Sequence, residues 1–319
     1  MHCVLIYNPA SGRNRSRRTE QLRDVAEALA ALGYKVDLLS TTAPGSATIQ
    51  AREASINGAD VVFACGGDGT IHEVIQGLIS ETGENTVALG ILPLGSANAL
   101  ARHLHLSLDP MTAALQQIHG TTQTISIGKL LYADELRYFT VMAGAGPDGA
   151  LAYEVVTGTK SSLGRFAYYL HAARLFFTRR FSPFEIEYFE MSSGNKRIRR
   201  AVSVMAVRVD DLGGLFSKLI GRYTPANDEY LRILILGPPA ILSLPLWFAS
   251  GWLSRHHWNP FLTLADVSEF SCRPLPDSVS DAAHIQVDGE WVGRLPMKVS
   301  LAPNSLRILM PSPQKKHST

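Results

Sequence analysis

The 319-residue sequence predicts an α/β N-terminal domain with a parallel sheet, followed by a β-rich, sandwich-like C-terminal domain. Three observations lead to this prediction. Strand-like and helix-like patterns alternate as far as about residue 122, which is typical of a parallel sheet covered by helices. Beyond that point, strand-like segments follow one another with few helices between them. A chain of this length commonly forms two domains.

The elements of the first domain are predicted from apolar runs and apolar periodicity. Residues 3–7 form an apolar run that ends at Asn8-Pro9, which predicts a buried strand, and apolar side chains recur at helical spacing over residues 22–32. Further strands are predicted at 35–40, 60–64 and 86–92, and further helices at 47–56 and 71–79. The last of these helices has the i, i+3, i+4, i+7, i+8 pattern of one buried face.

The second half of the chain is dominated by strand-like segments. Strands are predicted at 123–131, 135–143, 185–191, 198–207, 230–236, 284–287, 297–301 and 306–309, with a helix at 165–178. We therefore expect a nucleotide-binding domain over residues 1–122, a β-rich acceptor domain over 123–312 whose last strand could return to the first domain, and a frayed tail over 313–319.

Composition and charge exclude several classes of protein. Lys and Arg number 30 and Asp and Glu number 28, so the formal charge is +2, which gives no support for nucleic-acid binding. Cys3, Cys65 and Cys272 are far apart, which suggests a reducing compartment and excludes a zinc site of four thiolates. The first residues lack a basic segment followed by an apolar one, so we expect a cytoplasmic protein without a signal peptide.

The strongest motif, Gly66-Gly67-Asp68-Gly69-Thr70, directly follows a predicted strand. Its glycines allow the backbone to approach a ligand closely, and Thr70 and Glu73 have the spacing of a capping box. Backbone amides at the positive end of a helix suit a phosphate group. Asp68 would repel phosphate directly, so we expect it to hold Mg²⁺ through water or to orient a hydroxyl group. A tight turn without a ligand is the alternative.

Two further polar loops follow predicted strands. Asn8-Pro9-Ala10-Ser11-Gly12 follows the first strand and precedes Arg13, and Gly95-Ser96 follows the strand at 86–92, where Ser96 could cap a helix. Ligands of open α/β sheets bind beyond the carboxyl ends of the strands. The three loops therefore predict a single phosphate-binding site.

Two segments of the second domain match motifs that could have either a functional or a purely structural role. Gly144-Ala145-Gly146-Pro147-Asp148-Gly149 matches a dinucleotide fingerprint, but no acidic residue lies between Val155 and Pro183, so we do not expect nicotinamide binding. Val287-Asp288-Gly289-Glu290 predicts a hairpin turn. Its acidic residues could also supply a general base, and the spacing does not decide between these interpretations.

Taken together, the three N-terminal motifs resemble the catalytic domain of diacylglycerol kinases, which bacterial lipid kinases, sphingosine kinases and ceramide kinases share. The resemblance rests on Asn-Pro-x-Ser-Gly, on Gly-Gly-Asp-Gly-Thr followed by Ile-His-Glu-Val, and on Pro-Leu-Gly-Ser-x-Asn-x-x-Ala-Arg. Asp148, Gly164, Tyr168 and the late Val-Asp-Gly-Glu extend it over nearly the whole chain. It implies a two-domain fold like that of NAD kinase and diacylglycerol kinase, with ATP bound between the domains.

The resemblance also implies roles for individual residues. Glu290 stands where the family has the base that takes the proton of the acceptor hydroxyl, and Asp68 would act through Mg²⁺ and water. The residues implied to line the nucleotide are Asn8, Pro9, Ala10, Ser11, Gly12, Thr41, Gly66, Gly67, Asp68, Gly69, Thr70, Ile71, His72 and Ser96. A structural Mg²⁺ would be held by Asp228 and by the backbone oxygens of Pro225 and Tyr230.

The sequence departs from the bacterial pattern at three places. Gly-Ser-Ala-Asn-Ala at 95–99 replaces the common Gly-Thr-x-Asn-Asp and is closer to the sphingosine and ceramide kinase form, which leaves the acceptor lipid open. Glu229 replaces a glycine in the segment of the structural metal, and Arg208 stands where relatives often have Asn.

An uncharged apolar stretch covers residues 233–253 and is long enough to span a bilayer. Pro238, Pro239 and Pro245 interrupt it, so we expect a buried strand to Leu236 and a short apolar helix over 242–253. That helix could pack in the core, line a lipid tunnel or contact a membrane interface.

These observations favour an ATP- and Mg²⁺-dependent kinase of a diacylglycerol- or sphingoid-like lipid, acting in phospholipid metabolism at the membrane surface. An NAD kinase-like enzyme with a soluble substrate is the first alternative, and a catalytically silent lipid- or nucleotide-binding module is the second. The chemistry of phosphoryl transfer needs mainly positioning and charge neutralisation, which suits the predicted loops. The sequence does not indicate the oligomeric state.

Overall fold

The structure, a computed structural model, describes residues 1–9, 15–79, 86–157, 181–209, 229–253, 255, 258–278 and 282–311. The chain divides into two compact units, Met1–Ile127 with Ala302–Thr319, and Gly128–Leu301. Strands β5 (Thr121–Tyr132) and β16 (Met297–Met310) each contribute residues to both units. The predicted helix at 165–178 lies outside the described residues.

A parallel sheet forms the centre of the first unit, in the order β2-β1-β3-β4, with the C-terminal part of β16 beside β4. Its strands are β1 (His2–Tyr7), β2 (Lys35–Ser40), β3 (Val61–Gly66) and β4 (Ala88–Pro93). Every residue of β3 and β4 is buried, as expected for strands that are covered on both faces. The predicted parallel α/β architecture is confirmed.

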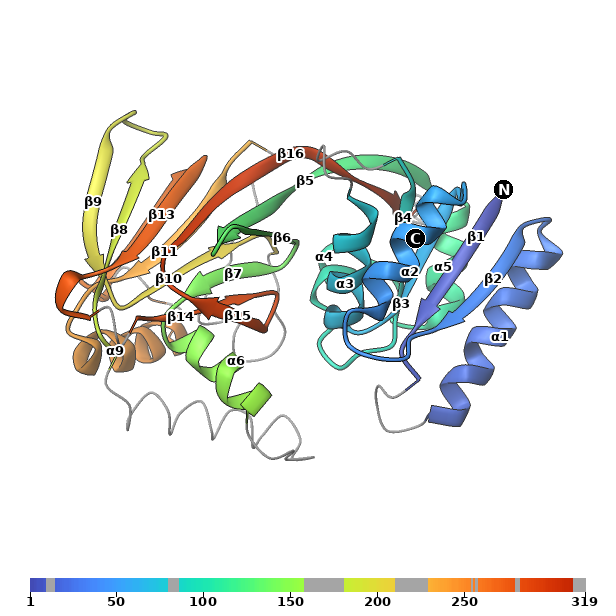
Figure 1. Ribbon diagram of the computed structural model, residues 1–319, viewed down its shortest axis with the longest axis horizontal. Coiled ribbons are helices and arrows are strands. Elements are labelled where there is room, and N and C mark those ends of the chain that lie inside the picture. Colours follow the sequence, from blue (N-terminus) through green and yellow to red (C-terminus); the bar gives the residue numbers. More distant parts are fainter. Residues whose placement is uncertain are drawn as a thin grey trace, which may run out of the picture. The chain divides into compact units, whose positions relative to one another are not determined.

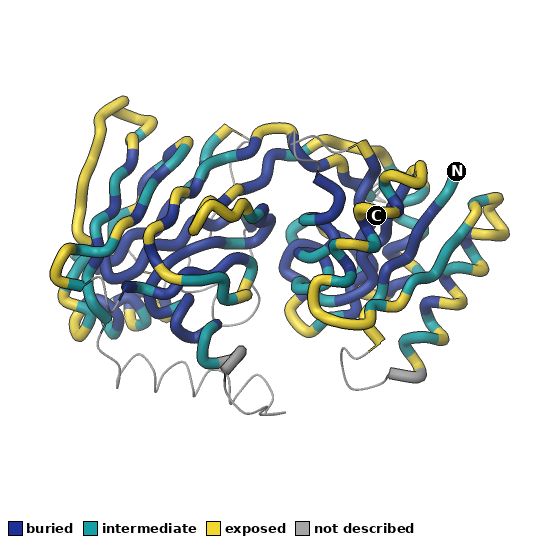
Figure 2. The backbone as a smooth tube through the Cα atoms, viewed as in Figure 1, coloured by how far each residue is buried: buried dark blue, intermediate teal, exposed yellow. Residues whose placement is uncertain are grey.

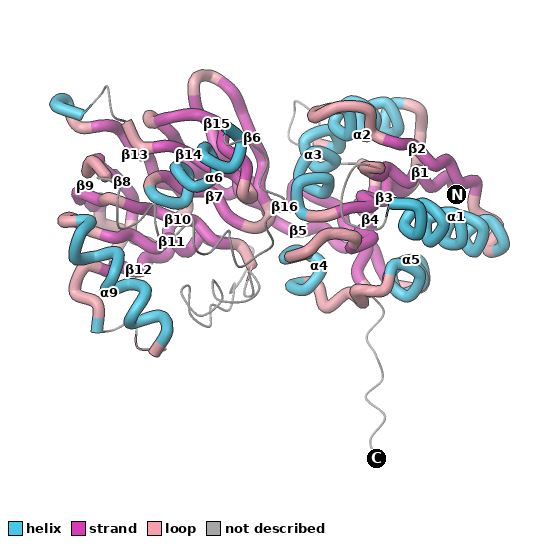
Figure 3. Tube along the Cα trace, turned by 90° about the horizontal axis from the view of Figure 1, so that it is seen from below, coloured by secondary structure: helices cyan, strands magenta, loops and turns pink. Residues whose placement is uncertain are grey.

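Helices cover both faces of this sheet. Figure 3 shows α2 (Ser46–Ile56) and α3 (Asp68–Leu78) on one face, and α1 (Arg15–Ala31) and α5 (Pro110–Ile118) on the other. Leu22, Val25 and Leu29 of α1 are buried against the sheet, as their helical spacing predicts. The sequence analysis missed α5, while the helix expected after Ser96 is the short α4 (Ala99–His103).

The second unit is built from antiparallel strands around one apolar core. One sheet has the order β12-β11-β10-β7-β14-β15, and strands β16, β13, β8 and β9 pair in the other, while β6 pairs with β5. The strand bounds are β6 Glu135–Phe139, β7 Met142–Ala145, β8 Phe184–Phe189, β9 Lys196–Ala201, β10 Ser203–Val207, β11 Leu231–Leu236, β12 Leu262–Val267, β13 Glu269–Pro274, β14 His284–Val287 and β15 Glu290–Arg294. Helix α6 (Pro147–Thr157) lies against β14 and β15 (Figure 1). Helix α9 (Ala240–Trp252) packs on β11. A single 3₁₀ turn, η2, covers Pro276–Ser278. The predicted β-rich architecture is confirmed.

Two segments predicted as single strands are each divided between two strands. The segment 135–143 breaks between β6 and β7, where the amides of Thr140, Val141 and Met142 bond to the carboxylate of Asp288 rather than to a neighbouring strand. The segment 198–207 breaks at Val202, because the basic β9 is exposed at the edge of one sheet while the apolar β10 is buried inside the other. Both predictions of one continuous strand were therefore wrong.

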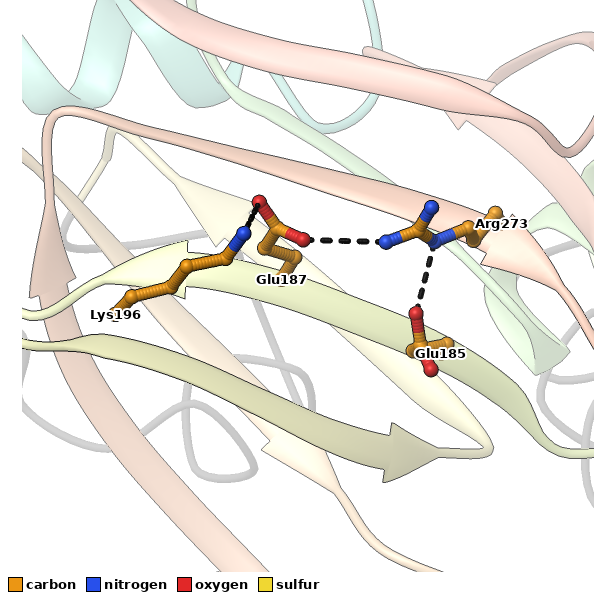
Figure 4. Close-up of polar contacts among 4 residues, drawn as sticks. All are labelled: Glu185, Glu187, Lys196 and Arg273. Carbon is orange, nitrogen blue, oxygen red and sulfur yellow. Dashed lines mark hydrogen bonds and ion pairs between the residues drawn. The ribbon is translucent and has the colours of Figure 1, made fainter.

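Charged side chains cover the outer face of strands β8, β9 and β13. Arg273 bonds to Glu185 at 2.8 Å and to Glu187 at 3.1 Å, and Lys196 bonds to Glu187 at 2.7 Å (Figure 4). Strand β9 is exposed along most of its length (Figure 2). This face of the second unit is therefore adapted to water.

The apolar stretch forms β11 and α9, as expected, although the helix begins at Ala240 rather than at residue 242. Pro245 lies inside the helix and does not end it. Its missing N–H deprives only the carbonyl of Ile241, a residue that is 81% exposed and so lies beside water. No helix among the described residues is long and apolar enough to cross a membrane.

Candidate active site

Three loops leave the carboxyl edge of the parallel sheet next to one another. Tyr7 pairs with Cys65, and Gly66 pairs with Pro93. The carboxyl ends of β1, β3 and β4 therefore lie side by side at the same edge of the sheet. The Thr41 amide donates to the Tyr7 carbonyl at 2.8 Å, so Thr41 lies beside the end of β1. This edge of the sheet gathers the predicted nucleotide loops that the structure describes.

Two of these loops touch backbone to backbone. A Cβ on Gly67 would lie 3.2 Å from the Gly95 Cα, and a Cβ on Gly95 would collide with the Gly67 Cα and lie 2.7 Å from the Asn98 side-chain oxygen. A Cβ on Gly66 would lie 2.6 Å from the Thr70 Cβ. A side chain at Gly95 would force the two loops apart, one at Gly67 would press on Gly95, and one at Gly66 would displace the side chain of Thr70.

The loop after β4 is stabilised by Asn98. Its side-chain oxygen accepts from the Gly95 amide at 2.9 Å, and its side-chain nitrogen donates to the Gly95 carbonyl at 3.1 Å. Asn98 adopts a left-handed φ of 51°, a conformation that asparagine tolerates better than most residues. The prediction that Ser96 caps a helix was wrong, since α4 begins after Asn98 and Ser96 is exposed.

Asp68 connects the second and third loops. Its Oδ1 accepts a hydrogen bond from the Ala99 amide at 2.8 Å, at the start of α4. The predicted capping box was wrong: α3 begins at Asp68, and the Glu73 carboxylate accepts from the Ala47 amide instead. The first helical bond runs from the Ile71 amide to the Gly67 carbonyl, so the amides before it have no partner within the helix.

In the second unit, Asp288 and Gly289 form the predicted two-residue hairpin turn between β14 and β15. Their φ values of 49° and 87° are those of a type I′ turn, for which Asp-Gly is favoured. The Asp288 carboxylate accepts from the amides of Val141 and Met142 at 2.9 Å and from that of Thr140 at 3.1 Å. Three bonds to one carboxylate fix the turn, and with it the exposed Glu290 that follows.

A buried polar pair stands behind the turn. The Gln286 side-chain oxygen accepts from the Gly289 amide at 2.9 Å, and its nitrogen donates to Asp148 Oδ2 at 3.1 Å. Burial raises the pKa of Asp148 to about 6, against the opposing effect of the Gln286 bond. The other Asp148 oxygen has no hydrogen-bond partner.

An aromatic group completes the surroundings of the hairpin. The Trp291 indole N–H donates to His284 Nδ1 at 3.0 Å, and the Tyr153 ring stacks on His284 with centroids 4.5 Å apart. Tyr153 comes from α6, His284 from β14 and Trp291 from β15. These contacts stiffen the strand pair that presents Glu290.

The chain is similar to known proteins over almost its whole length. Residues 2–130 match the diacylglycerol kinase catalytic domain. The diacylglycerol kinase of Bacillus subtilis (strain 168) is 30% identical over 308 residues, covering 96% of this chain and 95% of the relative. The chain belongs to the diacylglycerol kinase family. It is accordingly a lipid kinase.

Other relatives agree with this assignment. The diacylglycerol kinase of Staphylococcus saprophyticus is 30% identical over 293 residues, covering 92% of this chain and 90% of the relative. The crystal structure of a diacylglycerol kinase from Bacillus anthracis str. Sterne superposes with a TM-score of 0.66 at 18% identity, covering 97% of this chain and 96% of that one. At that identity the likeness concerns the fold.

The residues predicted to line the nucleotide of this lipid kinase have different surroundings. Ala10, Ser11 and Gly12 lie outside the described residues. Asn8, Pro9 and Ser96 are exposed, and Thr41 and residues 67–70 are half-buried. Gly66 and the side chains of Ile71 and His72 are buried, so these three positions offer mainly backbone to a ligand.

The predicted structural metal site is described only at Tyr230, because Pro225 and Asp228 lie outside the described residues. The Tyr230 carbonyl accepts a hydrogen bond from the Arg208 guanidinium at 3.2 Å. A guanidinium at this oxygen competes with a divalent cation for the same acceptor and repels it. The structural metal site stays a prediction.

Sequence reasoning missed the residues that hold others in place. Asn98, Gln286 and the support of Asp288 for residues 140–142 were not predicted. Only the Asp-Gly pair carried a signal, because its turn preference is local. The hydrogen bond between Gln286 and Asp148 joins residues that are far apart in the chain, so no local sequence pattern predicts it.

We predict that Gly95→Ala lowers the free energy of unfolding by about 1–3 kcal/mol, because the new methyl group forces the Gly67 backbone away. Nucleotide binding should weaken with it. Gly237→Ala is the matched control, since its Cβ would meet nothing closer than 3.7 Å. Urea denaturation and nucleotide titration measure both effects, and equal stability of the two variants would contradict the packing argument.

We predict that Asp148 makes the stability of the protein depend on pH. Its pKa is raised from 3.8 to about 6 in the folded protein, so the folded state holds the proton more tightly than the unfolded state. Ionisation of Asp148 therefore lowers the free energy of unfolding. This loss of stability is absent below the pKa of Asp148 in the unfolded chain, grows as the pH rises through its pKa in the folded protein, and reaches about 3 kcal/mol. Asp148→Asn should therefore gain stability relative to the wild type as the pH rises.

Urea denaturation over a pH series measures this difference. Asp134→Asn, a change at an exposed turn residue, serves as the control and should follow the wild type. Parallel pH profiles for Asp148→Asn and the wild type would exclude a buried, titrating Asp148.

Proposed function

We propose that this lipid kinase transfers the γ-phosphoryl group of ATP to a hydroxyl group of a diacylglycerol- or sphingoid-like lipid. The observation that carries the proposal is the convergence of the loops after β1, β3 and β4 with the N-terminus of α3 at one edge of the parallel sheet. The diacylglycerol kinases among its relatives support the acceptor class.

In the first unit, the backbone does most of the binding. The amides at the start of α3 would bind phosphate oxygens. The close contact of Gly67 with Gly95 holds the loops after β3 and β4 side by side, so that both could contribute backbone to one ligand. Bound Mg²⁺ would neutralise phosphate charge, and Asp68, held by the Ala99 amide, would orient it through water.

In the second unit, Glu290 would take the proton of the acceptor hydroxyl. The role suits an exposed carboxylate that is presented at the end of a stiff hairpin. Asp288 and Gln286 hold the turn in place and would keep Glu290 in position without touching the acceptor. Proton removal makes the hydroxyl oxygen a better nucleophile for the γ-phosphorus.

The acceptor is proposed to come from a membrane, so the reaction would take place at its surface. Ala99 stands in the third motif, where many bacterial relatives have an aspartate. This leaves two acceptor chemistries to compare, the glycerol-based and the sphingoid-based lipids.

We predict that the purified protein with ATP and Mg²⁺ phosphorylates at least one member of a panel of diacylglycerol, monoacylglycerol, sphingoid base and ceramide. Radiolabel transfer from γ-labelled ATP into the organic phase measures it. NAD in the same assay tests a soluble acceptor. Transfer to NAD alone would overturn the proposed function.

We predict that Glu290→Gln lowers kcat by roughly 100- to 10,000-fold, because the amide cannot accept the hydroxyl proton. Nucleotide affinity should stay within about twofold of the wild type, since Glu290 is proposed to act on the acceptor. Glu135→Gln, an exposed change in the same unit, should keep normal turnover. Normal turnover of Glu290→Gln would show that another group is the base.

A further inference from the structure

Helix α9 exposes an apolar face. Ile241 is 81% exposed, Trp252 61% and Leu253 57%. Leu242 and Leu246 are exposed on the same helix, at positions that recur about once per turn. A helix on the surface of a water-facing protein would carry polar side chains here.

The polar and apolar side chains of α9 are distributed in the opposite way to those of an ordinary surface helix. Its hydroxyl groups lie on the buried face, where Ser243 is fully buried without a hydrogen-bond partner and Ser250 donates to the Trp247 carbonyl at 3.1 Å. Leu244 and Trp247 on that face are also buried. The helix therefore has enough apolar contact on its inner side and still presents large apolar residues outside.

Neighbouring residues extend this face. Trp258 and Leu264 are 53% and 52% exposed, and Leu264 pairs with Leu234 of β11, the strand on which α9 packs. Together Ile241, Leu242, Leu246, Trp252, Leu253, Trp258 and Leu264 make up what we call the α9 surface. Exposed large apolar residues that gather on one helix and the segments next to it are typical of an interaction site.

The stretch of chain that forms the α9 surface has a single charged residue, which is basic. Between residues 233 and 265 the sequence has no Asp or Glu, and Arg255 is its single Lys or Arg. The Arg255 guanidinium lies 4.2 Å from the centroid of the Trp258 ring. An exposed indole beside a cation is typical of side chains that lie at the level of lipid headgroups.

Other exposed large apolar residues of the described unit lie on strands β5, β6, β8 and β9 and on the turn after β8: Leu131, Leu136, Phe189, Met191 and Ile198. On β8 and β9 they lie among charged side chains, which include the ion pairs of Arg273 and Lys196 (Figure 4). The α9 surface differs because its exposed apolar residues are larger in number and have a single charged residue, Arg255, in the same stretch of chain.

We propose that the α9 surface docks on an anionic lipid bilayer, with α9 lying in the plane of the interface. The inference rests on the proposed function in one respect: a kinase of a membrane lipid needs such a contact. A bilayer with anionic headgroups fits better than a second copy of the chain, because residues 233–265 contain no Asp or Glu with which the Arg255 of a second copy could pair. The 13 residues of α9 suit an interfacial helix and are too few to span.

Vesicle sedimentation without nucleotide tests the docking separately from catalysis. The probes are vesicles of phosphatidylcholine with phosphatidylglycerol, and vesicles of phosphatidylcholine alone. Ile241→Ser with Leu246→Ser changes the α9 surface, and Ile49→Ser with Ile56→Ser on α2 is the control, because both positions are also exposed. Trp252→Ala is a second, milder variant, and thermal unfolding confirms that each variant is folded.

The wild type and the α2 control should bind the anionic vesicles. The double α9 variant should bind at least about tenfold more weakly, Trp252→Ala should fall between them, and neutral vesicles should bind the wild type more weakly. A folded α9 variant that binds like the wild type would overturn the proposal. The proposal would also be overturned if the wild type bound neither kind of vesicle. It would be overturned as well if the wild type were a dimer and the α9 variant a monomer.

Phosphoryl transfer to detergent-dispersed diacylglycerol separates the two proposals. If the α9 variant keeps this transfer and loses vesicle binding, both stand. Vesicle binding without transfer to any lipid would remove the proposed function and leave the docking surface. If the protein phosphorylates a lipid but the α9 variant binds vesicles as well as the wild type, the proposed function stands and the docking surface does not.

Discussion

The Asp288 carboxylate accepts hydrogen bonds from three successive amides, those of Thr140, Val141 and Met142, and much of the second unit depends on this contact. The bonds satisfy amides that would otherwise continue a strand, so β6 ends and β7 begins in the other sheet. A buried amide must find a partner, and a carboxylate is a strong one. The same residue forms the turn before Glu290, so sheet architecture and the candidate base share one origin.

A different constraint shapes the first unit, where backbone lies against backbone. Gly95 lies too close to Gly67 to carry a side chain, and Asp68 bonds to the amide of Ala99 in the neighbouring loop. Both units thus use the same principle. Loops that could bear chemistry are held by contacts to main-chain atoms, which vary little with the side chains around them.

The sequence was sufficient for features with a local signature. Apolar runs and helical spacing predicted the strands and helices around Cys65 and Ile71, and Asp288-Gly289 predicted the hairpin. It was insufficient where a distant partner decides. The capping box at Thr70 failed because Glu73 bonds to Ala47 on another helix. The break at Thr140 and the burial of Asp148 beside Gln286 depend on residues more than a hundred positions away.

Among the described strands, β9 lies at the edge of its sheet, and it carries Lys196, Arg197, Arg199 and Arg200. An edge strand has unpaired amides and carbonyls on which another chain could add a strand of its own. Lys196 and Arg197 are held in ion pairs with Glu187 and Glu190, while Arg199 and Arg200 are exposed beside them. A second molecule that paired along this edge would have to place its own strand against these arginines, so the basic edge disfavours the addition of a strand.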